Sequence, residues 1–344
     1  MFVYRGKIIS LILVITLVMS VFGCRKVEKR PDIDEDQGAK SQEKQGENQE
    51  SEKDLSALIP EQIREDGGKE PSIKVYIVEE KKIKEMKFEE YVMGVLAGEM
   101  ENDWPEEALM AQAVLARTFV LKFITEKGGS KHEGAHVSTD IEEAQAWNAE
   151  KINDRIKQAV EKTRGQVAIH KGKLINAWFH SHAGGKTATA KEGLGFEEDE
   201  PPYIKAVESP DSKEAPKEHA NWTAVFTKDE VIAALKETGQ TVSEFDKIEI
   251  IEKGPSNRAL KLKISDTTVH APSFRIAIGS KKMKSAKIEN ISVDNNKVTI
   301  NGMGYGHGVG LSQWGAYHLA NNGEKSMQIL EHYFKDIEIV NLWD

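Results

Sequence analysis

Cysteine, excess positive charge and long hydrophobic runs are all scarce in this sequence, and each shortage excludes a class of protein. The 344 residues contain one cysteine, Cys24, so no disulfide can form within the chain. Asp and Glu outnumber Lys and Arg by 56 to 47, and the net charge of −9 argues against a nucleic-acid partner. One apolar run, from Ile8 to Gly23, is short for a membrane-spanning helix and suits the core of an export signal.

The first 24 residues have the order expected of a segment that directs export. Arg5 and Lys7 precede the apolar run, and a small residue, Gly23, stands directly before Cys24. This order is typical of a bacterial lipobox, in which the cysteine thiol is acylated. An uncleaved N-terminal anchor is the alternative, because Phe22 is bulky for a lipobox. In both cases we expect an extracytoplasmic protein attached to the membrane through its N-terminus.

A polar segment separates this N-terminus from the folded part. Residues 25–72 are rich in Glu, Lys, Gln, Asp, Ser and Gly, with almost no aromatic residues. Such a segment cannot bury enough apolar surface to offset the entropy lost on ordering. We therefore expect residues 25–72 to form a flexible tether.

The most informative stretch of the folded part is a helical pattern that begins at Phe88. Apolar residues recur there at i, i+3, i+4, i+7 and i+8, and the next position on this stripe is Glu99. A buried carboxyl either finds a partner or has its pKa raised, and a raised pKa suits a general acid. A structural ion pair with Arg117 is the other interpretation. Gly98 would let another surface approach the backbone closely.

A second helix is predicted just after this one. Asp103-Trp104-Pro105-Glu106 has the pattern of a capping box, with Asp103 as the N-cap and Pro105 in the first turn.

Further along, residues 166–170 and 174–180 alternate like the two strands of a hairpin that turns at Lys171-Gly172. The second strand ends in His180, Ser181 and His182, a polar cluster that suits a binding site. These residue types also suggest a hydrolase. No G-x-S-x-G elbow surrounds Ser181, however, so we disfavour a serine nucleophile.

A glycine-rich loop follows near the C-terminus. Glycine occupies every second position from Gly302 to Gly310, which exposes backbone amides to whatever docks there. The spacing matches neither the dinucleotide fingerprint nor a P-loop. Ser312 is predicted to cap the next helix. His307 is either a structural hydrogen-bonding group or a ligand to substrate, and no spacing around it indicates a metal site.

Residues 208–295 have shorter strands around one helix, with several glycine and asparagine turns. We interpret them as a second lobe inserted into a core formed by residues 73–207 and 296–344. The predicted fold class is α+β: a mixed helical and β core domain with a smaller, β-rich inserted lobe and a cleft between them.

Four motifs, in order, resemble the stage II sporulation protein D family, and the resemblance implies a peptidoglycan lytic transglycosylase. The motifs are Gly98-Glu99-Met100 with Ala111 to Thr118, Phe179-His180-Ser181 with Gly184 to Thr187, Pro202 to Val207, and Gly304 to Ala316. The resemblance extends from about residue 73 to residue 334.

The resemblance also implies which residues form the site. The family's catalytic acid falls on Glu99. Its substrate-binding positions fall on Arg117, His180, Tyr203, Lys205, His307, Ser312 and Gln313. Some relatives hold zinc through a His and Cys cluster after the second helix. His136 is present here, but residues 137–147 contain no cysteine. We therefore expect no metal and no other cofactor.

By resemblance, the substrate is the glycan strand of peptidoglycan. The bond between N-acetylmuramic acid and N-acetylglucosamine would be cleaved to a 1,6-anhydro end during engulfment in sporulation. The implied partners are a cell-wall amidase and a membrane partner of the engulfment machinery. One carboxyl suffices, because the sugar's own C6 hydroxyl replaces the water that a hydrolase activates with a second carboxylate. Two alternatives remain: a glycan-binding module that enhances an amidase, and a structural anchor between membrane and wall.

Overall fold

The computed structural model describes residues 55–344, which belong to one compact unit, Lys53–Asp344. Cys24, the predicted anchor and the first part of the predicted tether lie outside the described residues. The tether prediction is wrong for its last part. A short 3₁₀ helix, η1 (Leu55–Leu58), and the buried side chains of Ile59 and Ile63 pack against the hydrophobic core. Apolar side chains return to the sequence at this point, and their burial stabilises an ordered chain.

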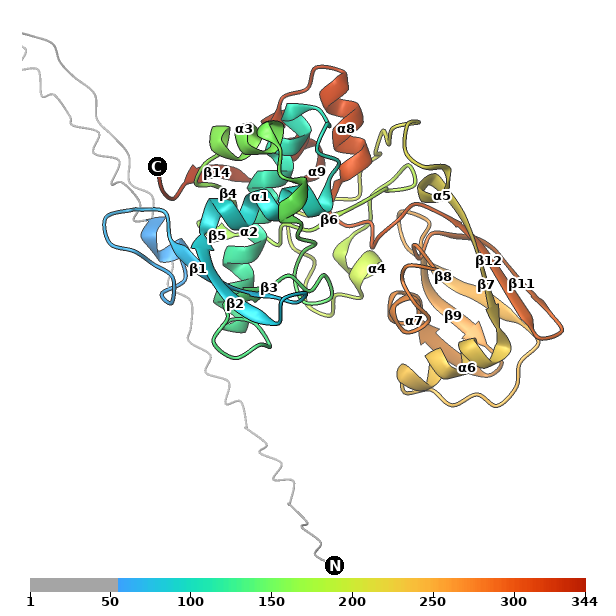
Figure 1. Ribbon diagram of the computed structural model, residues 1–344. Helices are drawn as coiled ribbons and strands as arrows, with labels where there is room; N and C mark the ends of the chain where they lie inside the picture. Colours follow the sequence, from blue (N-terminus) through green and yellow to red (C-terminus); the bar gives the residue numbers. More distant parts are fainter. Residues whose placement is uncertain (1–54) are drawn as a thin grey trace, which may run out of the picture. The chain divides into compact units, whose positions relative to one another are not determined.

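The larger of two hydrophobic clusters is built around a pair of helices, α1 (Phe88–Glu99) and α2 (Glu106–Lys127), which lie side by side with α3 (Asp154–Lys162) in Figure 1. The stripe predicted from the sequence is buried completely: Phe88, Tyr91, Val92, Val95 and Leu96 are inaccessible to solvent. Two further helices pack on α2, namely α8 (Gln313–Asn321) and α9 (Ser326–Tyr333).

Helix α2 is the one described helix that is long and apolar enough to cross a membrane. Most of its apolar residues are buried against α1, α3, α8 and α9, which is how a core helix behaves. The predicted cap of this helix is wrong. The N-cap is Pro105, with no capping side chain, and the helix begins one residue later, at Glu106.

Small sheets complete this part of the molecule. The first has the order β2-β1-β3, the second β14-β4-β5, and a third pairs β13 with β6. Their strands are β1 (Ser72–Ile77), β2 (Lys82–Lys87), β3 (Val137–Ser138), β4 (Gln166–His170), β5 (Lys173–Leu174), β6 (Phe179–His180), β13 (Leu311–Ser312) and β14 (Glu338–Asn341).

The predicted hairpin is only half right. Strands β4 and β5 do pair across the turn at Lys171-Gly172, but β5 ends at Leu174. Strand β6 is separate and runs parallel to β13, with Phe179 opposite Leu311 and His180 opposite Ser312. The polar cluster after β6 therefore lies beside the glycine-rich loop rather than at the end of a hairpin.

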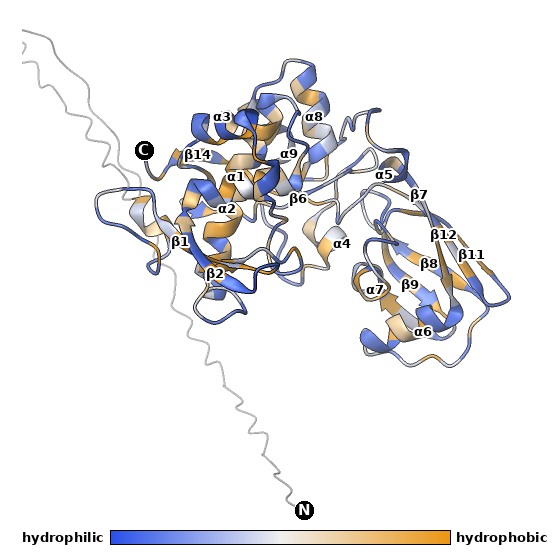
Figure 2. Ribbon diagram, viewed as in Figure 1, coloured by the Kyte–Doolittle hydropathy of each residue, from blue (hydrophilic) through white to orange (hydrophobic). Residues whose placement is uncertain are grey.

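The second hydrophobic cluster is formed by two three-stranded sheets and two helices, with strand orders β11-β12-β7 and β10-β9-β8. Every second side chain of β7 is buried, and Figure 2 shows the strands of both sheets coloured by hydropathy. The elements are β7 (Asn221–Thr227), α6 (Lys228–Glu237), β8 (Ile248–Lys253), β9 (Ala259–Ile264), β10 (Thr267–His270), α7 (Ala271–Ala277), β11 (Ile288–Asp294) and β12 (Lys297–Met303).

The mixture of helices and small sheets confirms the predicted α+β class. The boundary drawn at residue 296 needs correction. Strand β12 pairs with β7 and β11, and its Val298 and Ile300 belong to the second cluster, so this strand packs with the residues predicted to form the inserted lobe.

Candidate active site

Glu99 is the last residue of α1, and its side chain is partly buried. One carboxyl oxygen, Oε1, accepts a hydrogen bond from the backbone N–H of Ala146 at 2.7 Å. Burial raises the pKa of Glu99 to about 6; the Ala146 bond and the nearby Gln313 amide oppose this without cancelling it. No cation contributes to this shift. Glu99 can therefore hold or release a proton close to neutral pH.

Two glycines of α1 allow the chain around Ala146 to lie against the helix. A Cβ added at Gly98 would lie 2.6 Å from the backbone nitrogen of Trp147, and one at Gly94 would lie 2.1 Å from the Trp147 indole nitrogen. The backbone N–H of Asn148 also donates to the Gly94 carbonyl at 2.9 Å. The prediction that Gly98 admits a close neighbour is confirmed, and the neighbour is the chain itself.

Side-chain hydrogen bonds brace the loop that leads to Ala146. Glu143 accepts from the Ser138 hydroxyl at 2.5 Å and from the Lys131 backbone N–H at 2.9 Å. The Lys131 ammonium in turn lies 2.6 Å from Asp140. Within residues 55–344, no group of three or more His, Cys, Asp or Glu side chains is arranged to hold a metal ion.

His136 belongs to the start of the same loop. Its Nδ1 accepts a hydrogen bond from the Lys74 backbone N–H at 3.0 Å. Burial lowers the pKa of His136, with a smaller effect from the Lys74 charge. A neutral imidazole thus ties the loop to strand β1.

Two of the predicted site residues begin helix α8, and they behave differently. Ser312 is fully buried and caps the helix: its hydroxyl accepts from Gly315 N–H at 3.3 Å and donates to Asp211 at 2.5 Å. The capping prediction is confirmed, but a substrate contact for Ser312 is contradicted.

Gln313 faces Glu99, yet its Nε2 forms no hydrogen bond of normal length with any described residue. This amide therefore acts on the Glu99 carboxyl without a closer hydrogen-bond partner among the described residues.

The predicted substrate role of Arg117 is wrong. Its guanidinium is completely buried and is paired with Glu89, with Nη2 2.7 Å from Oε2 and Nε 3.0 Å from Oε1. It also donates to the Gln166 carbonyl at 2.8 Å. Arg117 does pair with a buried glutamate, as the structural interpretation held, but the glutamate is Glu89 rather than Glu99.

Tyr203 and Lys205 have partners elsewhere in the core. The Tyr203 hydroxyl accepts from Asn176 N–H at 2.8 Å, and the side chain is 8% exposed. The Lys205 ammonium donates to the Glu331 carbonyl of α9 at 2.8 Å. Neither side chain shares a partner with Glu99. The structure shows no contact of Tyr203 or Lys205 with Glu99, and their substrate contacts stay predictions.

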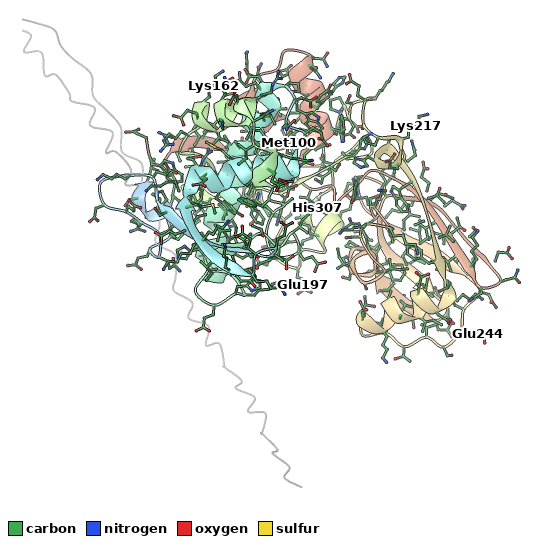
Figure 3. The ribbon with its side chains drawn as sticks, in the orientation of Figure 1. Met100, Lys162, Glu197, Lys217, Glu244 and His307 are labelled. Atoms are coloured by element: carbon green, nitrogen blue, oxygen red, sulfur yellow. The ribbon has the colours of Figure 1, made fainter. Side chains whose placement is uncertain are left out.

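His180 and His307 are neutral and serve the glycine-rich loop. His180, 4% exposed, has its Nδ1 3.1 Å from the Val309 carbonyl, and burial holds its pKa well below the usual range. Burial, then Arg275 and Arg258, lower the pKa of His307 to about 3; its Nδ1 accepts from Val309 N–H at 3.0 Å. His180 Nε2 has no hydrogen-bond partner among the described residues, so its substrate contact stays a prediction, and the structural interpretation of His307 is favoured. Figure 3 labels His307 in this loop, and Met100 directly after Glu99.

A buried arginine directly before β9 packs against both the glycine-rich loop and the segment after β6. The guanidinium of Arg258 donates to the carbonyls of Lys186 and Ala183, at 2.8 and 2.7 Å. A Cβ added at Gly308, where φ is +87°, would lie 2.4 Å from this guanidinium. Glycine is therefore required at residue 308 by packing as well as by backbone conformation.

Comparisons with known proteins show which family the chain resembles. The profile of the stage II sporulation protein family matches residues 76–170, and that of a domain of unknown function (DUF8618) matches residues 203–310. The chain is 29% identical over 297 residues to stage II sporulation protein D of Bacillus amyloliquefaciens, covering 80% of this chain and 83% of that protein. Stage II sporulation protein D of Bacillus subtilis is 27% identical over 280 residues, with 78% of each covered.

An uncharacterized protein of Brachyspira hyodysenteriae is 33% identical over 75% of this chain and 68% of its own length. The chain therefore belongs to the stage II sporulation protein D family. The amidase enhancer of Bacillus subtilis is also related, at 27% identity over 70% of this chain, but the match covers 39% of that protein.

Proposed function

We propose that this protein is a lytic transglycosylase that acts on the glycan strands of peptidoglycan during the engulfment stage of sporulation. The observation that carries the proposal is the environment of Glu99, a partly buried carboxyl with a pKa of about 6 and no cation beside it. A general acid works best when its pKa lies near the working pH.

In the proposed reaction Glu99 first protonates the glycosidic oxygen between N-acetylmuramic acid and N-acetylglucosamine. The bond from that oxygen to C1 breaks, and the C6 hydroxyl of the same muramic acid attacks C1. The Glu99 carboxylate then takes the hydroxyl proton, which restores the acid and leaves a 1,6-anhydro end. The Ala146 N–H holds Oε1, so Oε2 is the oxygen that carries the proton.

The hydrogen bonds of Glu143 favour transfer over hydrolysis. Glu143 and Glu99 both act electrostatically on the Tyr91 hydroxyl, so Glu143 is the second carboxylate to consider. Both oxygens of Glu143, however, already accept hydrogen bonds from Ser138 and Lys131. Glu143 is therefore not available to activate a water molecule, which a hydrolytic glycosidase requires of its second carboxylate.

The substrate determines where the protein works. Peptidoglycan lies outside the cytoplasmic membrane, so the folded part acts on the outer face, held there by lipidated Cys24 or by an uncleaved N-terminal anchor. The implied partners are a cell-wall amidase, which removes stem peptides, and a membrane protein of the engulfment machinery.

A second candidate is a glycan-binding protein that enhances an amidase without cleaving glycan itself. The name of the related amidase enhancer supports it. In that case Glu99 would bind the strand, and its acidity would have no function.

Purified full-length protein, incubated with peptide-free glycan strands, distinguishes the two. We expect soluble fragments with 1,6-anhydro ends by mass spectrometry from the wild type, and none from Glu99→Gln. Fragments with reducing muramic acid ends would indicate hydrolysis and overturn the proposal. No fragments from either protein, with equal enhancement of a purified amidase by both, would establish the second candidate.

A further inference from the structure

A chain of contacts leads from Gln313, beside the acid, to four polar and aromatic side chains that the proposed reaction does not use. The backbone N–H of Trp314, the residue after Gln313, donates to the Ser181 carbonyl at 3.0 Å. The Ser181 hydroxyl lies 3.2 Å from Nδ1 of His219. Ser181 and His219 therefore lie near the N-terminal end of helix α8, which is also where Gln313 lies.

The contacts continue to an aromatic ring and a cation. The rings of His219 and Tyr305 form a T-shaped contact, with ring centroids 4.9 Å apart and planes at 75°. The Lys284 ammonium lies 4.4 Å from the centre of the Tyr305 ring. His219 belongs to the short helix α5 (Lys217–Ala220), whose first residue is labelled in Figure 3.

Backbone hydrogen bonds hold this group in place. Tyr305 and His182 exchange both of their backbone hydrogen bonds, at 2.8 and 3.0 Å. Gly306 N–H donates to the Lys284 carbonyl at 2.9 Å. The positions of Tyr305 and Lys284 thus do not depend on contacts made by their side chains.

The packing of the hydrophobic core does not explain why these four side chains are present. Ser181, His219, Lys284 and Tyr305 are all partly exposed, and none belongs to either hydrophobic cluster. Burial lowers the pKa of His219, and Lys284 adds to the effect, so the ring is neutral at pH 7 and can donate as well as accept a hydrogen bond.

We propose that Ser181, His219, Tyr305 and Lys284 form a sugar-binding subsite for a glycan strand whose scissile bond lies at Glu99. The proposal rests on the proposed function. The apolar face of a sugar ring packs on an aromatic side chain, while a hydroxyl and an imidazole exchange hydrogen bonds with sugar hydroxyls.

Lys284 gives the subsite its specificity. Its ammonium meets the lactyl carboxylate that distinguishes N-acetylmuramic acid from N-acetylglucosamine. Arg117, the arginine that the family resemblance offered for this contact, is buried against Glu89 and cannot reach a substrate.

Calorimetric binding with two oligosaccharides tests the subsite, using full-length Glu99→Gln protein so that no cleavage occurs. One probe is a peptide-free tetrasaccharide of alternating N-acetylglucosamine and N-acetylmuramic acid. The other is chitotetraose, which lacks carboxylates. We expect Lys284→Met to weaken binding of the first probe about fivefold, the range of an exposed ion pair, and to leave chitotetraose unchanged.

Tyr305→Leu removes the aromatic face, so we expect it to weaken the binding of both probes about tenfold. Tyr305→Phe keeps the aromatic face and should keep the affinity for both probes. Lys281→Met is the matched control, since Lys281 is exposed on the same segment. Thermal melting checks that each variant is folded. If Tyr305→Leu is not folded, the affinities of Lys284→Met and Tyr305→Phe test the subsite.

Equal affinity of Lys284→Met and Lys281→Met for the muramic acid probe would overturn the proposal, as would equal weakening of both probes by Lys284→Met. The outcome is separate from that of the proposed function. If Glu99→Gln still cleaves glycan, the proposed acid is wrong while the binding differences stand. If cleavage depends on Glu99 but Lys284 and Tyr305 do not affect binding, only the subsite is wrong.

Discussion

Helix α1 carries two buried or partly buried glutamates, and the structure gives them opposite roles. Glu89, near the start of the helix, accepts hydrogen bonds from the Arg117 guanidinium, from Gly165 N–H at 3.0 Å and from the Trp343 indole at 2.8 Å. Glu99, at the end of the helix, accepts one backbone hydrogen bond and has no cation nearby.

The comparison shows that burial alone does not make a catalytic acid. A buried carboxylate that is fully paired, as Glu89 is, braces the elements around it, and removing one partner leaves an uncompensated charge. A carboxyl that is desolvated without a cation instead retains its proton to higher pH. Glu89 therefore holds α1, α2 and the C-terminal segment together, whereas Glu99 keeps a carboxyl that can take up and release a proton near pH 6.

The largest effect is expected from Glu99→Gln, which keeps the size of the side chain but removes its proton. Loss of a general acid should lower the rate of anhydro-end formation about a thousandfold, within the range for this kind of catalysis. The rate is measured by mass spectrometry of the fragments. Glu101→Gln, an exposed neighbour, is the control and should keep full activity. Similar losses in the two variants would contradict the special position of Glu99.

The Glu89→Gln variant should instead unfold more readily than the wild type. It leaves Arg117 as a buried charge without a counterion, so we expect the free energy of unfolding to fall by about 3 to 5 kcal/mol. Urea unfolding followed by circular dichroism measures the loss. The exposed neighbour Glu90→Gln should change the free energy little. If Glu89→Gln were as stable as Glu90→Gln, the bracing role would be wrong.

Gly98→Ala tests how the backbone around Ala146 sets the acidity of Glu99. The new methyl group would collide with the backbone of Trp147 and displace the Ala146 N–H. That hydrogen bond lowers the pKa of Glu99, so its loss should raise the pKa above 6. Because the protonated acid is the active form, the fall of activity with rising pH should move to higher pH, and the maximal rate should drop about tenfold. An unmoved pH profile would count against this prediction.

The smallest expected effect is a change in the free energy of unfolding with pH. The folded pKa of Glu99 is about 6 and its ordinary value is 4.5, so the folded state binds the proton more tightly. The protonated form stabilises the folded state fully below pH 4.5, and this contribution is lost as the pH rises through 6. The loss lowers the free energy of unfolding by up to about 2 kcal/mol. Glu99→Gln cannot ionise, so its stability relative to wild type should rise between pH 4 and pH 8. Parallel stability curves for the two proteins over this range would be inconsistent with a raised pKa.

Local patterns in the sequence predicted those features that depend on neighbours along the chain. The 3.6-residue period located Glu99 at the end of the buried stripe of α1, and the hydroxyl of Ser312 identified the start of α8. The alternating glycines indicated a loop with exposed backbone amides, but at Gly308 the space left by the missing side chain is filled by the Arg258 guanidinium. The α+β class followed from the same patterns.

Tertiary structure alone decided which charged groups meet. Arg117 and Glu89 are 28 residues apart, and no periodicity says which of three glutamates on one helix will face a given arginine. The same holds for Ala146, which supplies the hydrogen bond to Glu99 from 47 residues further along the chain. Periodicity determines which face of a helix is buried because it is a local geometric property, whereas the partner of a buried charge depends on how distant segments pack.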